Sequence, residues 1–145
     1  MTWVVHSDWL ERHFDGTQAL DLDAALAGDT IKLGIVTESA IDADTNAVYT
    51  GLTAVATGTA WTGPVTLANI ACGLNGSNNL VFDADDPSVI AQDSGGGFSN
   101  ARSLIIYEDT NKYIIAHHTE GSAFGNVSGP ITTTLAAGGI WELTI

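Results

Sequence analysis

Short apolar segments separated by turn-forming residues follow one another along the chain from Thr30 onward. In the first of them Ile31, Leu33 and Ile35 occupy alternate positions, and alternate side chains of a strand point to one face of a sheet. Turn signals recur roughly every ten residues, a spacing typical of sandwiches. The alternation of strands and helices that a parallel α/β sheet requires does not occur. The pattern predicts an all-β fold, a single antiparallel β-sandwich of about seven or eight strands.

The apolar segments also predict particular strands and a core. Residues 102–107 and 113–117 read as a hairpin joined by the polar loop 108–112. Further strands are expected at residues 65–70, 79–83, 131–135 and 140–145. The side chains expected in the core are those of Ile31, Leu33, Ile35, Leu80, Phe82, Leu104, Ile106, Ile114, Trp141 and Leu143.

Two stretches rich in small residues, Thr50–Pro64 and Gln92–Asn100, are expected to be exposed loops. Loops carried by a rigid sheet are where binding sites concentrate. A length of 145 residues fits one domain. We expect an N-terminal arm with a short helix over residues 1–26 and the β-sandwich domain over residues 27–145.

The N-terminal segment is the one part with helical character. Ser7 is expected to cap a short helix that runs to Phe14. Its apolar residues would form one stripe on neighbouring turns. Two interpretations stay open: the stripe packs on the domain's own core, or it docks on another subunit. The stripe consists of Trp9, Leu10, His13 and Phe14.

The charge balance excludes several classes of function. The chain has 17 acidic and 4 basic residues, a formal net charge of −13. Four scattered bases on such a body do not provide the phosphate contacts that nucleic acids or anionic membranes require. No apolar run is long enough for a transmembrane helix, and the first residues lack the regions of a signal peptide. Only 14% of the residues are charged, against about 25% in a typical soluble domain, which indicates an oligomer or a docked subunit.

Acidic turns are the nearest approach to a metal site. Asp42, Asp44 and Asn46 begin like an EF-hand loop, but Ala47 and Thr53 stand where the loop needs Gly and Glu. A solvated acidic turn is the preferred interpretation, and a loose calcium site is the alternative. The same two interpretations apply to the acidic stretch 83–86.

Nothing in the sequence resembles an active site. His117 and His118 are adjacent in a strand, so their side chains point to opposite faces, while Glu120 can reach the face of His118. Cys72 has no basic neighbour that would lower its pKa. The triple glycine at residues 95–97 lacks the flanking strand and lysine of a phosphate-binding loop. We therefore expect no enzyme, no cofactor and no metal.

Four segments together resemble a family of small virion proteins of tailed bacteriophages. They are Asp29–Thr37, Leu80–Asp86, Ala101–Asp109 and Gly139–Ile145. Their order is similar too, with a short helix ahead of the first segment and a Gly/Thr-rich middle. The resemblance implies a decoration, or cement, protein that binds the outer surface of the phage head and bridges subunits of the major capsid protein. The acidic charge agrees with an outer position, because packaged DNA repels a protein of charge −13.

Aromatic residues outside the expected core are the candidate interface. Tryptophan is enriched at binding hot spots, and the segment Met1–Phe14 holds two of the four tryptophans. We expect a homo-oligomer, a trimer, whose capsid or oligomer interface uses Trp3, Trp9, Leu10, Phe14 and Trp61. The alternative is a receptor- or glycan-binding module of a tail or head fibre, in which Trp61 stacks on a sugar. A glycan hydrolase is a third possibility, which would need two carboxylates at a defined separation.

Overall fold

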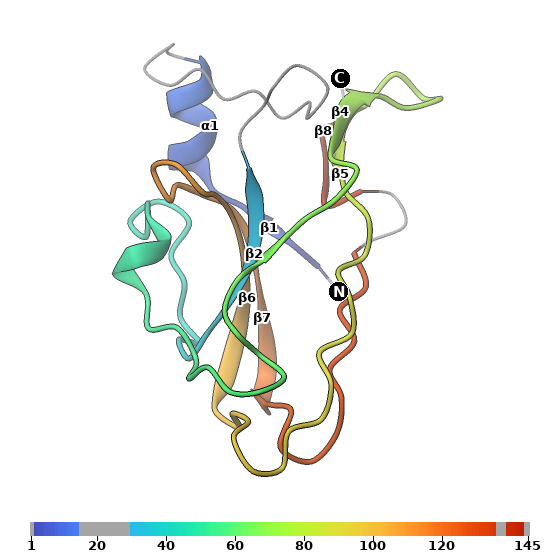
Figure 1. Ribbon diagram of the computed structural model, residues 1–145. Coiled ribbons are helices and arrows are strands. Elements are labelled where there is room, and N and C mark those ends of the chain that lie inside the picture. The colour runs from blue at the N-terminus through green and yellow to red at the C-terminus, as the bar shows by residue number, and fades with distance from the viewer. Residues whose placement is uncertain (1, 15–29, 136–138, 144–145) are drawn as a thin grey trace.

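Eight strands and one short α-helix make up the chain in the computed structural model, which describes residues 2–14, 30–135 and 139–143 but not the side chains of 12–14 and 141–143 (Figure 1). The prediction of an all-β fold with one short N-terminal helix is confirmed. In chain order the elements are β1 (Val4–Val5), α1 (Ser7–Phe14), β2 (Ile31–Val36), a 3-10 turn η2 (Tyr49–Gly51), β3 (Val65–Thr66), β4 (Ala71–Leu74), β5 (Leu80–Asp83), β6 (Ala101–Glu108), β7 (Ile114–Phe124) and β8 (Trp141–Leu143).

The strands form two antiparallel sheets. The larger has the order β1-β7-β6-β2-β3 and the smaller has the order β4-β5-β8. The predicted hairpin is present as β6 and β7. The segment expected as a strand over 65–70 shortens to β3, and Ile131 makes only an isolated bridge to Ile90. The strand β4 was not predicted, because its small residues lack the alternation typical of a strand.

The central strand β6 is buried on both faces. Leu104 and Ile106 belong to the main core, whereas Ile105 and Tyr107 belong to a second apolar cluster on the other face. Strands covered on both sides read as continuous apolar runs rather than as alternating ones. This explains the uninterrupted apolar stretch within β6.

Most of the predicted core is confirmed. The smaller sheet contributes Phe82, which is fully buried in the same cluster as the larger sheet's residues. Leu80 is only half-buried, and the side chains of Trp141 and Leu143 lie outside the described residues. The remaining predicted side chains are buried: Ile31, Leu33, Ile35, Leu104, Ile106 and, in the second cluster, Ile114.

The second cluster is built on a glycine. The rings of Tyr49 and Tyr107 stack with centroids 4.2 Å apart and an interplanar angle of 3°. A Cβ atom at Gly34 would lie 2.5 Å from the Tyr49 ring, far inside contact distance. Gly34 therefore lets the loop that carries Tyr49 lie directly on the sheet.

The two stretches expected as exposed loops are mostly exposed, but each is anchored in the core by buried side chains that the prediction did not include. Trp61 and Phe98 are each only 3% exposed, and their rings meet edge to face with centroids 6.3 Å apart. Val55 is buried with them. Apolar side chains placed singly in a polar stretch have no periodicity, so the sequence pattern did not show their burial.

The N-terminal segment contributes the edge strand β1 to the larger sheet. Val4 and Val5 of β1 pair with His117 and Ala116 of β7. The helix begins at Ser7, but the Ser7 hydroxyl donates to the Asp44 carboxylate instead of capping the helix. The expected boundary between residues 26 and 27 lies outside the described residues.

Leu33→Ala is expected to lower the free energy of unfolding by about 2–5 kcal/mol, the usual cost of removing a large buried side chain. Leu33 is 1% exposed in the main core. Urea denaturation measures the loss, with Val89→Ala as control because Val89 is 56% exposed. A loss below about 0.5 kcal/mol at Leu33 would contradict its burial.

Candidate functional site

Three loops meet at one end of the larger sheet, the lower end in Figure 1. We call residues 55–63, 92–99 and 121–131, the last of which begins with the final residues of β7, the loop end. Asp93 N donates to the carbonyl oxygen of Asn126 over 2.8 Å, and Gln92 Nε2 donates to that of Val127 over 3.1 Å. Segments far apart in sequence thus form one continuous surface.

Asp93 holds two of these loops together. Its carboxylate accepts the backbone N–H groups of Thr59, Ala60 and Gly96 at 2.8, 3.2 and 2.9 Å. These hydrogen bonds, first that of Ala60, lower the pKa of Asp93, because they favour the charged form. The carboxylate is therefore engaged within the loop end and structures it.

Asn126 holds the third loop against the second. The side chain is fully buried, its Oδ1 accepts from Phe98 N at 3.0 Å, and its Nδ2 donates to Ala91 O at 3.1 Å. At the neighbouring Gly125 a Cβ atom would lie 1.9 Å from the carbonyl oxygen of Phe98. The loop end is thus fixed in shape by buried polar contacts.

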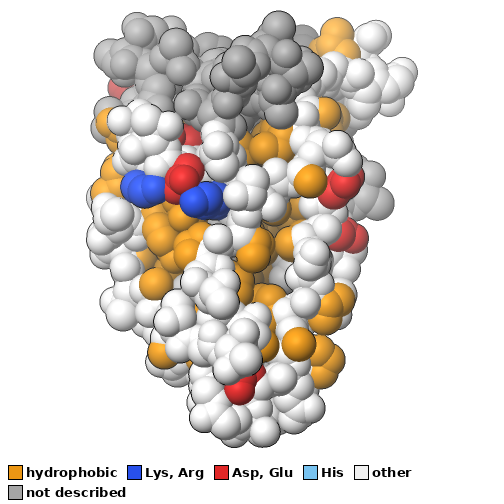
Figure 2. Space-filling view, viewed as in Figure 1, with side chains coloured by type: hydrophobic (Ala, Val, Ile, Leu, Met, Phe, Trp, Pro, Cys, Tyr) orange, Lys and Arg blue, Asp and Glu red, His pale blue; other side chains and the backbone are white. Residues whose placement is uncertain are grey.

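The loop end is almost free of charge. No Asp, Glu, Lys or Arg occurs between Asp44 and Asp83, or between Glu120 and Glu142. Asp93 is therefore the one charged residue among the three loops. The face seen in Figure 2 agrees: its lower part is mostly uncharged, and its Lys, Arg and most of its acidic groups lie higher. Depletion of charge is the compositional mark of the core of a protein interface.

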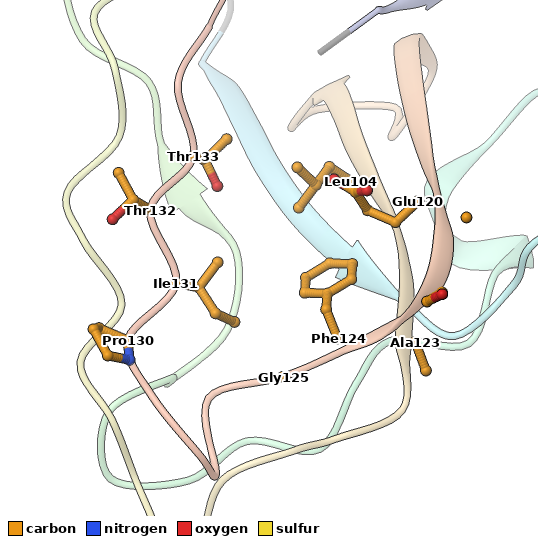
Figure 3. Close-up of a pocket in the computed structure, with 11 residues that line it drawn as sticks. Leu104, Glu120, Ala123, Phe124, Gly125, Pro130, Ile131, Thr132 and Thr133 are labelled. Carbon is orange, nitrogen blue, oxygen red and sulfur yellow. The ribbon is translucent and has the colours of Figure 1, made fainter.

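A groove of about 590 Å³ opens beside the loop end. The side chains of Phe124 and Ile131 face one another across it, and Leu104 lies beside Glu120 (Figure 3). Glu120 is the one charged residue that lines it. Thr132 and Thr133 also line the groove, and the side chain of Thr133 points toward Leu104 while that of Thr132 points away from it (Figure 3).

The predicted interface residues are placed differently from expectation. Trp3, Trp9 and Trp61 are 9%, 3% and 3% exposed and belong to the main core. Leu10 is half-buried against the same core, and the side chain of Phe14 lies outside the described residues. The three tryptophans fill this chain's own interior, so they leave little surface for a partner, and Trp61 offers no platform to a sugar.

The adjacent histidines point to opposite faces, as predicted. His118 Nδ1 lies 2.7 Å from Thr2 O, and its Nε2 lies 3.2 Å from a carboxylate oxygen of Glu120. His117 is buried and contacts His6. The contact with His6 was missed because the two residues are far apart in sequence and neither belongs to a metal-ligand motif.

The acidic turns use their carboxylates on the chain itself. Asp42 accepts from the backbone N–H of Asp44 at 2.9 Å, and Asp85 accepts from Asn69 Nδ2 at 2.6 Å. Asp86 accepts from Leu135 N at 2.6 Å. Within the described part of the chain no three Asp, Glu, His or Cys side chains group as a metal site would require. Cys72 is half-buried on β4.

Fold and site together define a β-sheet module with one rigid, nearly uncharged end. Comparison with known protein families, curated proteins and solved structures finds no match. Among the described residues no helix is long and apolar enough to cross a membrane.

Proposed function

We propose that the protein is a structural subunit of a virus particle, a decoration protein that binds the outer surface of a tailed-phage head and bridges major capsid subunits. The observation that carries this proposal is the nearly uncharged loop end on a chain of net charge −13. A surface with so few charges can be buried against a protein lattice at a low desolvation cost. In this role the chain is not an enzyme and uses no cofactor.

The loop end has further properties of a docking surface. The side chains of Asp93 and Asn126 fix its backbone before binding, so little conformational entropy is lost on association. Most of its exposed residues are small, among them Ser94, Ala123 and Ser128, which allows the close approach of another backbone. The acidic residues elsewhere favour an outward position, away from packaged DNA.

The capsid proposal is tested with particles from the source culture. Immunogold labelling with an antibody against the chain is expected to mark heads, and cryo-electron microscopy to show a fixed number of copies per capsomer. Three copies around each three-fold or quasi-three-fold position would agree with a trimer. Label on fibres or tails would contradict the proposal and support the receptor-binding alternative.

The orientation is tested with charge insertions. The double variant Ala123→Glu/Ser128→Glu places two carboxylates on exposed positions of the loop end. Its occupancy on particles that lack the chain is expected to fall at least about tenfold in co-sedimentation, because burying unpaired charges is costly. The control Ala71→Glu/Ser77→Glu changes exposed positions of β4 and its turn and is expected to bind like the wild type. Equal binding of both variants would remove the loop end from the interface.

A further inference from the structure

A buried histidine pair joins the N-terminal segment to the larger sheet. His6 Nε2 lies 2.9 Å from His117 Nδ1, and the two rings meet edge to face with centroids 5.0 Å apart. His6 is 0% exposed and His117 is 6% exposed. The pair lies where the chain leaves β1 and enters α1, beside the hydrogen bond from His6 N to Ile115 O at 3.0 Å.

The contact depends on the protonation of both rings. A neutral imidazole has one N–H donor and one acceptor nitrogen, whereas an imidazolium has two donors and no acceptor. One facing nitrogen must donate and the other must accept. If both rings are protonated, two N–H groups face each other at 2.9 Å. If one ring is protonated, an imidazolium charge lies in a buried site, where desolvation opposes it.

The groups around the histidine pair have opposing effects on the pKa of His6. Burial and then the proximity of His117 lower the pKa of His6 from 6.5 to about 4, although Asp8 of α1, Asp42 and the backbone of Asn46 favour the charged ring. Burial and then the neighbouring His118 lower the pKa of His117. Glu120 lies next to His118. The effect of the nearby carboxylates on the pKa of His6 is therefore smaller than the opposite effect of burial.

We propose that the His6–His117 pair is an acid-sensitive latch, whose protonation detaches residues 2–14 from β7 while β2, β6 and the rest of β7 stay paired. The detached state exposes both rings, so it binds protons more readily than the closed state. Protonation of His6 therefore favours detachment as the pH falls below about 6.5, and the contribution of this ring is complete below about 4. His117, whose pKa is also lowered by burial, adds to the same direction. This pKa difference raises the population of the detached state by up to about 300-fold. Because detachment also exposes Trp3 and Trp9 of the main core, the detached state stays a minor one, which hydrogen exchange detects.

Pulsed hydrogen–deuterium exchange on the full chain between pH 7.5 and 4, corrected for the intrinsic exchange rates, tests the latch. Peptides from residues 2–14 and 114–118 are expected to lose protection at least about tenfold between pH 6.5 and 4.5, while β2 and β6 stay protected. His6→Gln and His117→Asn each keep a neutral amide near the contacting nitrogen and are expected to abolish most of this pH dependence. Val5→Ala, the matched control on β1, is expected to open more at every pH with the wild-type pH dependence.

Two results would overturn the latch. One is loss of protection in β2 and β6 at the same pH as in residues 2–14, which would mean global unfolding. The other is an unchanged opening midpoint in both histidine variants. If His6→Gln fails to fold, the pH dependence of His117→Asn alone tests the latch. If both variants fail to fold, the test is whether residues 2–14 of the wild-type chain lose protection at a higher pH than β2 and β6.

Discussion

A chain that begins at Gly16 is expected to melt at a clearly lower temperature than the full chain and to aggregate. The deletion removes Trp3 and Trp9, both buried in the main core. It also leaves the outer edge of β7 without its partner β1, although β7 still pairs with β6. Burying one such aromatic ring stabilises a protein by about 3–5 kcal/mol, judged by the cost of truncating it. Two rings approach the whole stability of a domain, about 5–15 kcal/mol.

Differential scanning calorimetry and light scattering measure this effect. Glu11→Ala is the control, because Glu11 lies on the exposed side of α1 and its loss leaves the core intact. A truncated protein that stays monomeric with an unchanged melting temperature would contradict the burial of the segment. It would restore the interpretation of residues 1–14 as an arm that docks on a capsid.

Trp61→Ala is expected to lower the free energy of unfolding by about 3–5 kcal/mol. Trp61 is 3% exposed and packs edge to face on Phe98, so its loss leaves a cavity between two loops. Trp61→Phe keeps most of the apolar contact and is expected to cost less. Chemical denaturation measures both, with the exposed neighbour in Thr62→Ala as control.

The stability of Trp61→Ala distinguishes a core role of Trp61 from a glycan-binding role. A tryptophan that stacks on a glycan is exposed in the free protein, so truncating it changes binding and leaves stability within about 0.5 kcal/mol of the wild type. A loss that small at Trp61 would contradict its place in the core. It would also revive the glycan-binding alternative.

Periodicity predicted the parts of the fold whose burial follows a regular pattern. The alternation of Ile31, Leu33 and Ile35 gave both the strand and its buried face, and all three are in the main core. The continuous apolar run in β6 predicted the strand but not the second apolar cluster on its other face. That cluster depends on Tyr49, which reaches the sheet from a distant loop because Gly34 leaves room for its ring.

The candidate site was less accessible to sequence reasoning. The long intervals without charge, between Asp44 and Asp83 and between Glu120 and Glu142, are visible in the sequence. That residues 55–63 and 121–131 of these intervals meet at one end depends on hydrogen bonds made by Asp93 and Asn126, which no local pattern encodes. The tryptophans chosen as contact residues are buried, because a large aromatic side chain in a polar segment can serve as a core anchor, which local sequence does not reveal.

The position of β8 has a practical consequence for labelling the protein. β8 pairs with β5 in the smaller sheet and lies near the upper end of the molecule in Figure 1, whereas the loop end is at the bottom. A fluorophore or peptide epitope joined after this strand would leave the molecule far from the loop end. If the loop end binds the particle as proposed, such a tagged chain reports binding without blocking the surface under test, and its tag faces the solvent.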